Sequence, residues 1–336
     1  MSERAHQGGR RALGAPAATP YLLATPVLLY VAVLILYPIG QGIYTSFTRT
    51  ELLSPLPPTW VGLANYRRLA HDPAFWRALG VTLTYTFLVV SATVVTSVLT
   101  ALLMNARFHG RAIARAAITL PYAVPEVAAV LVWTWMLSQQ FGVLNVFARW
   151  VLPVSENLPW LTNTRMAMVS ILLVTLWKIF PFYSLVVLTA FQTLQAELYE
   201  AARIDGAGAL ACFRHITIPG IAPTLGLMTL LATIFSFRRF TVIYLLTGGG
   251  PADATKTLVV SVYENAFKFF DLSYGSTIGV AGLGVTLAIA ETMIEMRGHN
   301  PQVLLCHLPQ FIQTEKQTDR IGPARNGNDH CLAAKR

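Results

Sequence analysis

The chain has 336 residues, of which 54% are hydrophobic and only 12% are charged. Soluble domains usually carry about 25% charged residues, so this composition argues against a soluble globular protein and favours a membrane protein. The formal net charge is +9, but the basic residues are scattered and form no patch interleaved with aromatic side chains. This pattern excludes a nucleic-acid-binding surface and favours attraction to anionic lipid headgroups.

Six apolar stretches follow one another along the chain, and each is long enough to cross ~30 Å of hydrocarbon, which takes about 20 residues in a helix. They are predicted at roughly residues 21–45, 79–104, 114–137, 166–190, 222–246 and 274–294. Charged side chains lie well inside three of these stretches, at Glu126, at Lys178 and at the adjacent pair Arg238 and Arg239. The sequence therefore predicts an all-α membrane protein with six transmembrane helices.

A basic segment precedes the first stretch, as in a secretory signal peptide. The apolar run is too long for the hydrophobic region of such a peptide, so we expect an uncleaved first helix behind a tail at residues 1–20. Short segments on the same side as this tail are dense in arginine, and the positive-inside rule therefore places both termini in the cytoplasm. The arginines concerned are Arg4, Arg10, Arg11, Arg107, Arg111, Arg115, Arg203 and Arg214.

The end of the chain changes in character at Glu291, where the apolar pattern stops. Residues 295–336 mix Gln, Asn, Asp, His and Arg without periodicity. Such a composition buries too little apolar surface to fold, so we expect a disordered tail. The uncharged run from Leu272 to Ala290 spans only about 28 Å as a helix. We therefore hypothesise a marginal sixth helix, with either a divergent end or a shifted reading frame near residue 290.

Residues 195–220 form a polar, helix-forming segment between two apolar stretches. The spacing predicts two short helices joined at glycine, because Gly206 and Gly208 can adopt the left-handed conformation that ends a helix. Pro219 is expected to end the second helix. One face of the first helix carries Leu198, Ala201, Ala202 and Asp205, and one side of the second carries Leu210, Phe213 and Ile216. Such an elbow suits docking into a groove of another protein; alternatively, it packs on its own bundle as an amphipathic connector.

The same segment carries a spaced motif: Glu200-Ala201-Ala202, three residues, Gly206, nine residues, then Ile216-Thr217-Ile218-Pro219. This pattern resembles the EAA loop of ABC importer permeases, which usually have leucine in place of Ile218. Five further segments resemble the carbohydrate-uptake class of this family, the sugar permeases of the maltose and glycerol-3-phosphate type. They read VGLANYRRL, DPAFWRAL, LPYAVPEV, ELYEAARIDGA and LLTGGGP. The resemblance extends from Tyr21 to Thr286.

The resemblance implies the type I ABC importer permease fold over residues 21–294, with residues 195–220 as a cytoplasmic coupling elbow. The chain is then a permease subunit of an ATP-driven importer for a sugar or sugar derivative, in the bacterial cytoplasmic (inner) membrane. It forms half of the translocation pore, in contact with membrane lipid, and has no catalytic residues or cofactor of its own. The residues implied in coupling are Glu200, Ala201, Ala202, Asp205, Gly206, Ile216 and Pro219.

Three protein partners follow from the resemblance. A separate cytoplasmic ATP-binding subunit binds ATP and Mg²⁺, because the chain itself has no Walker A sequence. A second homologous permease completes the pore, and an extracytoplasmic solute-binding protein delivers the solute.

Charged residues inside membrane-spanning segments cost about 2.5–3.5 kcal/mol each to insert, so they mark candidate positions on the translocation pathway. Arg238 and Arg239 cannot both face the same way, and we expect one to face the interior and the other to face outward. The family often has an aromatic–aspartate pair just after this position, from which the double arginine departs. Lys178 and Glu126 either line the pathway or pair with each other. Two aromatic candidates, which either stack on a sugar ring or simply pack, are Trp177 and Tyr244.

The segment Gly248–Thr257, GGGPADATKT, invites comparison with a phosphate-binding loop. Thr255 stands where glycine must precede the lysine, which argues against nucleotide binding. By resemblance, the segment is instead an outer loop that faces the delivering protein, and its glycines allow a tight turn. The residues concerned are Gly248, Gly249, Gly250 and Pro251.

Two rival classes fit a chain with several crossings. A self-sufficient secondary transporter often carries inverted repeats with broken helices, which the sequence does not indicate. An intramembrane glycosyltransferase needs acidic residues clustered at one membrane face, and Glu126 is nearly alone. No metal site is predicted, because the adjacent cysteine and histidine residues at 306–307 and 330–331 do not match zinc spacing.

Overall fold

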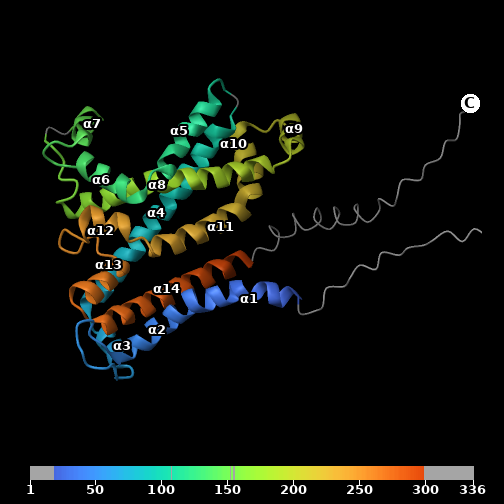
Figure 1. Ribbon diagram of the computed structural model, residues 1–336. Coiled ribbons are helices and arrows are strands. Elements are labelled where there is room, and N and C mark those ends of the chain that lie inside the picture. Colours follow the sequence, from blue (N-terminus) through green and yellow to red (C-terminus); the bar gives the residue numbers. More distant parts are fainter. Residues whose placement is uncertain (1–18, 107, 152, 154–155, 299–336) are drawn as a thin grey trace, which may run out of the picture. The chain divides into compact units, whose positions relative to one another are not determined.

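The computed structural model describes residues 19–106, 108–151, 153 and 156–298. The predictions for the N-terminal tail before residue 19 and for the C-terminal tail from residue 299 lie outside the described residues. The chain divides into two compact units, which are described separately (Figure 1). One unit consists of Met1–Phe75 with Ser261–Ala281, and the other of Trp76–Val260 with Gly282–Arg336, as far as these ranges are described.

The first unit contains a long apolar helix and a small connector. Its elements are α1 (Thr19–Val31), the π-helical η1 (Ala32–Leu36), α2 (Tyr37–Ser46), β1 (Thr48–Arg49), β2 (Thr59–Trp60), α3 (Ala64–Ala70), the π-helical η3 (Glu264–Lys268) and the start of α14 (Leu272–Gly298). α1, η1 and α2 join into one apolar span, Ala24–Ser46, whose side chains are mostly exposed. An exposed apolar helix of this length requires lipid or another apolar surface around it.

The connector of the first unit is held by polar and aromatic contacts. β1 and β2 pair antiparallel, with Thr48 opposite Trp60. Arg68 in α3 forms an ion pair with Asp271, with 2.8 Å between Nη1 and Oδ2. The Arg68 guanidinium also lies 3.9 Å from the ring centroid of Tyr274. These contacts fix α3 against the first turn of α14.

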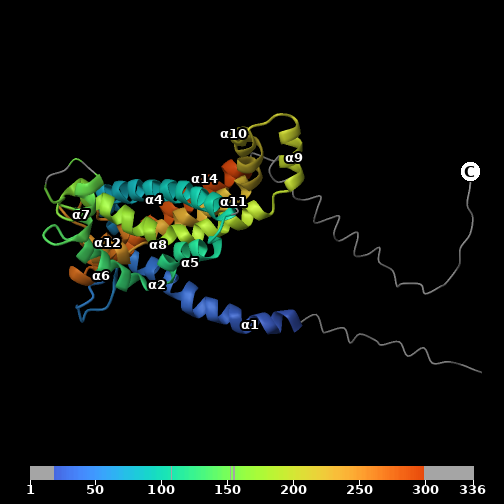
Figure 2. The ribbon, with the colours of Figure 1, turned by 90° about the horizontal axis from the view of Figure 1, so that it is seen from above.

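The second unit contains the remaining helices and is arranged around α8. Its elements are most of α4 (Pro73–Asn105), α5 (Arg111–Ala123), α6 (Glu126–Met136), α7 (Val143–Val151), α8 (Thr164–Gln192), α9 (Ala196–Ile204), α10 (Ala209–Cys212), the π-helical η2 (Phe213–Thr217), α11 (Ile218–Phe237), α12 (Thr241–Thr247), the start of α13 (Leu258–Tyr263) and the end of α14. Figures 1 and 2 both place α7 at one end of α8 and α9 at the other. With 29 residues, α8 is about 43 Å long, enough to span the bilayer and reach beyond it.

The core of the second unit lies along α8. Asn163 caps the N-terminus of this helix, because its side chain accepts hydrogen bonds from two backbone N–H groups of the first turn. The hydroxyls of Tyr85 in α4 and Thr175 in α8 are hydrogen-bonded at 3.2 Å, and both residues are buried. The surrounding apolar core includes Val89, Val130, Ile171, Val174, Val187, Ile221, Val242 and Ile243.

Five helices are long and apolar enough to cross a membrane among the described residues, and a sixth span results if a bent pair counts as one. The five are Ala24–Ser46, Pro73–Asn105, Thr164–Gln192, Ala209–Phe237 and Leu272–Met296. The bent pair consists of α5 and α6, which turn by 96°. The predicted all-α membrane class is confirmed, and so are the six crossings when the bent pair is counted as one.

Two predicted crossings differ from the structure. An unbroken helix over 114–137 is wrong, because Val124 is extended (φ −68°, ψ 134°) and the following Pro125 has no N–H. An unbroken helix over 222–246 is also wrong, because α11 ends at Phe237 and α12 begins only at Thr241. At the other end of the chain, α14 does not stop at the acidic residue Glu291 but continues to Gly298. The sixth helix is therefore longer than the apolar run indicated.

Candidate functional site

The segment between α8 and α11 is a helical elbow that turns at glycine. Gly206, just after α9, has φ +81°, the left-handed conformation. The N–H of Ala207 donates to the carbonyl of Ala202 at 2.8 Å, and the N–H of Gly206 donates to that of Arg203 at 3.1 Å. These two bonds form the Schellman pattern, which satisfies carbonyls at a helix end. Gly208 was expected to share the left-handed conformation, but its φ is −74° and it precedes α10 in extended backbone.

The second arm of the elbow is the beginning of a membrane span. α10, η2 and α11 continue as one helical rod from Ala209 to Phe237. Pro219 lies in the first turn of α11, a position that accommodates proline, so the prediction that it ends the helix is wrong. The two arms are joined by a hydrogen bond of 2.9 Å between the hydroxyls of Tyr199 and Thr217. The elbow is therefore braced rather than a loose loop.

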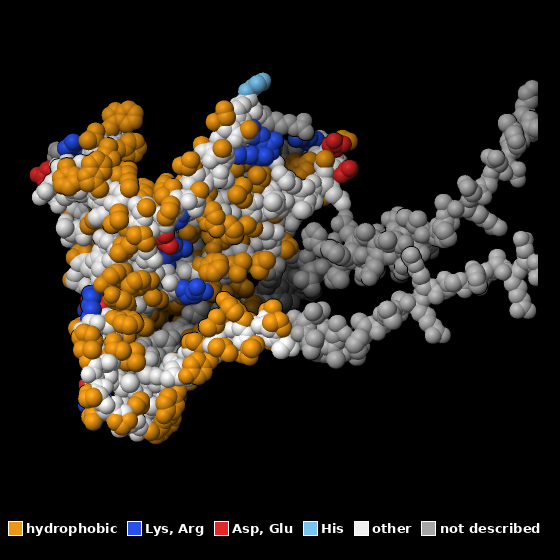
Figure 3. Space-filling view, in the orientation of Figure 1, with side chains coloured by type: hydrophobic (Ala, Val, Ile, Leu, Met, Phe, Trp, Pro, Cys, Tyr) orange, Lys and Arg blue, Asp and Glu red, His pale blue; other side chains and the backbone are white. Residues whose placement is uncertain are grey.

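The surface of the elbow is open. No side chain of α9 is buried, and the predicted coupling residues are exposed except for Ala202 and Ile216, which are half-buried. Two large apolar side chains stand out near the turn, Ile204 with 87% exposure and Leu210 with 78%. Charged side chains gather over the α9 end in Figure 3. Sequence reasoning missed Ile204, although an apolar residue just before a helix-ending glycine is a usable signal.

The bend between α5 and α6 is held by a lysine from α8. The Nζ atom of Lys178 donates to the carbonyls of Pro121 at 3.1 Å and Tyr122 at 3.0 Å, and also to that of Val124. A proline follows these carbonyls and supplies no N–H, so an unassisted break would leave acceptors without partners. The ammonium group also meets the negative end of the α5 dipole. Lys178 therefore stabilises the bend directly.

A second charged contact joins the bend between α5 and α6 to the gap between α11 and α12. Arg239 lies between α11 and α12, and its Nη1 is 2.8 Å from Oε1 of Glu126 in the first turn of α6. The side chains are 16% and 35% exposed, respectively. Lys178 and Glu126 were considered as a pair; instead, Lys178 binds backbone carbonyls and Glu126 binds Arg239. The neighbouring Arg238 is exposed, with its guanidinium 6.0 Å from the ring centroid of Phe235.

Aromatic side chains surround this charged region. The ring of Trp177 in α8 meets that of Trp133 in α6 edge to face, with centroids 5.5 Å apart. Tyr244 and Phe240 are stacked at 4.8 Å. All four are partly buried in the second unit. The aromatic candidates therefore pack in pairs beside the helix breaks.

The glycine-rich loop after α12 is a tight turn. Gly248 and Gly249 have φ values of +62° and +90°, which glycine adopts readily. Thr255 is buried and closes the turn, because its hydroxyl donates to the carbonyl of Gly250 at 2.7 Å and contacts the Thr247 hydroxyl at 2.7 Å. The threonine that argued against a phosphate-binding loop thus has a structural role. Pro251 follows Gly250 through a cis peptide bond.

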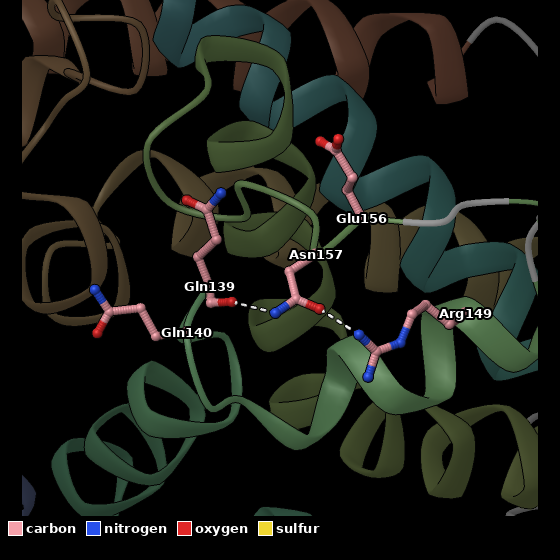
Figure 4. Close-up of a pocket in the computed structure, with 5 residues that line it drawn as sticks. All are labelled: Gln139, Gln140, Arg149, Glu156 and Asn157. Atoms are coloured by element: carbon pink, nitrogen blue, oxygen red, sulfur yellow. Dashed lines mark hydrogen bonds between the residues drawn. The ribbon is translucent and has the colours of Figure 1, made fainter.

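A polar pocket near α7 was not singled out from the sequence. Figure 4 shows its lining residues, Gln139, Gln140, Arg149, Glu156 and Asn157. Arg149 donates to the side-chain oxygen of Asn157 at 2.8 Å, and the amide of Asn157 donates to the carbonyl of Gln139 at 2.8 Å. The pocket lies at the end of α8 opposite to the elbow (Figure 1). Among the described residues, no group of three or more His, Cys, Asp or Glu could hold a metal ion.

Comparison with known proteins gives consistent matches. The family model of binding-protein-dependent transport system inner membrane components matches residues 93–294. The sulfoquinovosyl glycerol transport system permease protein SmoG of Agrobacterium fabrum is 32% identical over 276 residues, 82% of this chain and 89% of SmoG. The trehalose/maltose transport system permease protein MalF of Thermococcus litoralis is 33% identical over 279 residues, 82% of this chain and 92% of MalF.

A solved structure gives the same fold. The crystal structure of a bacterial ABC transporter involved in the import of the acidic polysaccharide alginate matches with a TM-score of 0.71 and 23% sequence identity. The match covers 82% of this chain and 94% of that chain. The type I importer fold expected from the sequence is therefore confirmed.

Replacing Lys178 should destabilise the bend. Lys178→Met leaves the α5 carbonyls without their charged donor, and we expect a loss of roughly 1–3 kcal/mol, the usual cost of an unsatisfied buried group. Lys178→Arg keeps donors in place and should restore part of this loss. Thermal unfolding of the purified chain in detergent measures the effect, with Lys256→Met as the control because it removes a lysine from an ion pair with Asp253. Equal shifts for Lys178→Met and Lys256→Met would contradict the assigned role.

The contact between Glu126 and Arg239 should be energetically coupled. We expect Glu126→Gln and Arg239→Gln each to cost about 1–3 kcal/mol, between the values for surface and buried ion pairs, because the side chains are partly exposed. The double variant should cost less than the sum of the singles. Unfolding in detergent measures this cycle, and Arg238→Gln serves as the matched control at the exposed neighbouring position. Additive effects within error would show that the two charges act independently.

Proposed function

The chain belongs to the family of binding-protein-dependent transport system inner membrane components, and we propose that it forms half of the pore of an importer for a sugar or sugar derivative. Within this family it is a multi-pass permease, a transport subunit. We propose that a separate ATPase supplies the energy, that a second permease of the same family completes the pore, and that a binding protein delivers the solute. The family description itself supports the binding protein.

The carbohydrate solute is supported by relatives of similar length. SmoG is named for transport of sulfoquinovosyl glycerol and MalF for transport of trehalose and maltose, and each match covers about four fifths of this chain. The aromatic pairs beside the helix breaks are compatible with such solutes, because aromatic faces suit the apolar faces of sugar rings. The arginine pair leaves neutral and anionic sugars both open.

Membership of the transport-system family favours a permease over the two rival classes, a secondary transporter and an intramembrane glycosyltransferase. Broken helices are present at α5–α6 and α11–α12, so their absence cannot be used against a secondary transporter. Copurification separates the classes: a permease of this family retains an ATP-binding subunit. A secondary transporter or an intramembrane glycosyltransferase functions without one.

The elbow is the observation that supports coupling to an ATPase. It lies between the fourth and fifth crossings, and six crossings place it on the same side as both termini. We assign this side to the cytoplasm, in agreement with the arginine distribution. The exposed Ile204 and Leu210 offer apolar contacts to a groove, and the Glu-Ala-Ala stretch borders them. An apolar tip of this kind needs a partner to remove it from water.

Three substitutions in the elbow should uncouple transport without unfolding the bundle. Glu200→Lys reverses a charge on α9, and Ala202→Trp holds the contact face away from its groove. Gly206→Val places a β-branched residue at φ +81°, which costs about 1–2 kcal/mol and misdirects the second arm. We expect normal amounts of permease in the membrane, weaker retention of the ATP-binding subunit and loss of sugar uptake, measured on the same preparations.

A matched control lies two residues from the turn. Gly208 has φ −74°, and no described atom lies within 4 Å of the place where a Cβ would stand, so valine is tolerated there. Gly208→Val should therefore keep both subunit retention and uptake. Full uptake in all three elbow variants, or the same loss in Gly208→Val, would sink the coupling role.

We propose that the translocation pathway passes the two helix interruptions, α5–α6 and α11–α12, and the charged side chains beside them. The Nε atom of Arg239 has no hydrogen-bond partner among the described residues, and an arginine at this depth is costly beside lipid but not beside a polar, water-containing pathway. We therefore expect at least one of Arg238 and Arg239 to be reachable from water. The remaining candidates on this pathway are Glu126, Trp177, Lys178 and Tyr244, which lie around the same breaks.

Cysteine labelling tests this pathway. Arg238→Cys and Arg239→Cys, each in a chain without the native cysteines, should react with a membrane-impermeant thiol reagent in at least one transport state. Leu227→Cys, at an exposed apolar position of α11, is the lipid-facing control and should stay unlabelled. Absence of labelling at both arginine positions in every state would exclude them from the pathway.

A further inference from the structure

The short helix α7 is mounted on the second unit by a buried asparagine. Asn145 is 2% exposed, and its amide donates to the carbonyl of Ser138 at 2.9 Å. Its side-chain oxygen accepts hydrogen bonds from the backbone N–H of Leu158 at 3.1 Å and from Nε1 of Trp160 at 2.8 Å. Ala148 is buried on the same side of the helix. This network ties α7 to the segments before and after it, so its orientation is fixed.

The opposite face of α7 is apolar and exposed, the reverse of a helix on a soluble protein. The face is made by large side chains at the i, i+3, i+4, i+7 and i+8 positions, an arc of about 140° at 100° per residue. Its members are Val143, Val146, Phe147, Trp150 and Val151, with exposures from 49% to 85%. Figure 3 shows hydrophobic side chains gathered over α7. Such a face is unfavourable in water and needs a cover.

We infer that α7 is a membrane-surface anchor, whose apolar face lies in the headgroup–acyl boundary of the bilayer at the N-terminal end of α8. The partner is the lipid surface itself. Helices of this kind lie in the plane of the interface, with apolar and aromatic residues directed into the lipid and polar residues directed to water.

Chain connectivity sets the depth of α7. Six residues separate the end of α6 at Met136 from the start of α7, and they reach at most ~20 Å. α8, which crosses the membrane, begins at Thr164, soon after α7. A helix enclosed in this way, between the end of the bent span α5–α6 and the start of α8, is held close to the membrane edge.

The apolar face also continues an exposed apolar surface of α6. Trp135 near the end of α6 and Phe141 before α7 are 59% and 61% exposed, and their ring centroids are 6.3 Å apart. Toward the start of α6 the exposed surface continues with Val127, Leu131 and Val132. Tryptophan and other aromatic residues are typical of the membrane–water boundary. This continuity favours lipid over a separate protein as the cover of α7.

The polar residues near α7 fit the water side of such an anchor. Arg149, the charged residue of the helix, lies outside the apolar arc and bonds Asn157 in the polar pocket. Glu156, Gln139 and Gln140 complete this pocket (Figure 4). The helix thus separates an apolar face from a polar pocket, the division that an interface requires.

The test places a fluorophore on each side of the proposed boundary. Phe147→Cys and Trp150→Cys are labelled with an environment-sensitive dye in a full-length chain whose three native cysteines are serine. Gln140→Cys, in the polar pocket, is the matched control. Each protein is reconstituted in vesicles of phosphatidylethanolamine and phosphatidylglycerol, alone and with its transporter partners. Quenching is measured with iodide in water, with lipid carrying a nitroxide near the headgroup, and with lipid carrying it near the chain end.

The inference expects blue-shifted emission at positions 147 and 150, with several-fold stronger quenching by the shallow nitroxide than by iodide or the deep nitroxide. The label at position 140 should show the reverse preference, for iodide. Both substituted side chains are exposed, so the fold should tolerate the labels. Iodide quenching at 147 and 150 equal to that at 140 would place the face in water. Strongest quenching by the deep nitroxide, or protection from lipid quenchers only in the assembled transporter, would equally overturn the anchor.

Discussion

A helix that breaks inside hydrocarbon must find hydrogen-bond partners without water, and this requirement organises the second unit. α5 ends just before Pro125, which has no N–H to offer the preceding carbonyls. Lys178 from the neighbouring α8 supplies donors to three of these carbonyls. One ammonium group therefore satisfies acceptors that would otherwise each cost free energy, and its charge opposes the dipole of α5. This contact lies at the 96° turn between α5 and α6 and stabilises it.

The same requirement changes how the charges inside the spans are understood. A charged residue in a membrane span usually suggests a transport pathway, because its insertion is costly. Here Lys178 and Glu126 both have structural partners, the first in backbone carbonyls and the second in Arg239. The pair between Glu126 and Arg239 joins the start of α6 to the gap between α11 and α12. The charges thus offset part of their own insertion cost by holding two broken helices together, and a role in the pathway must be compatible with these bonds.

Local sequence patterns predicted the fold class but not the interruptions in the third and fifth crossings. Apolar runs located the spans because the length needed to cross hydrocarbon is a property of local sequence. Pro125 was a visible signal for the bend in the third crossing, and Pro219 was taken as a helix end although the first turn of a helix accommodates proline. The partners of Lys178 lie more than fifty residues away along the chain, so spacing could not identify them. At the elbow, local chemistry sufficed for Gly206, whose left-handed conformation follows from the Schellman turn. α7 was not predicted, because a nine-residue helix is far shorter than the apolar runs that mark membrane spans.

The elbow and the charged breaks are linked by one helical rod. The span from Ala209 to Phe237 has 29 residues, about 43 Å of helix, and it begins at the elbow and ends at the gap that contains Arg239. The bond between Tyr199 and Thr217 joins α9 to the first part of this rod. A helix of this kind resists stretching and compression. The rod can therefore respond to a displacement of α9 in two ways. Either the rod bends within the π-helical η2, where the regular hydrogen-bond ladder is already altered, or its far end moves and the contact between Arg239 and Glu126 changes with it. The architecture therefore gives the exposed elbow a direct mechanical connection to the place where two broken helices meet through charge.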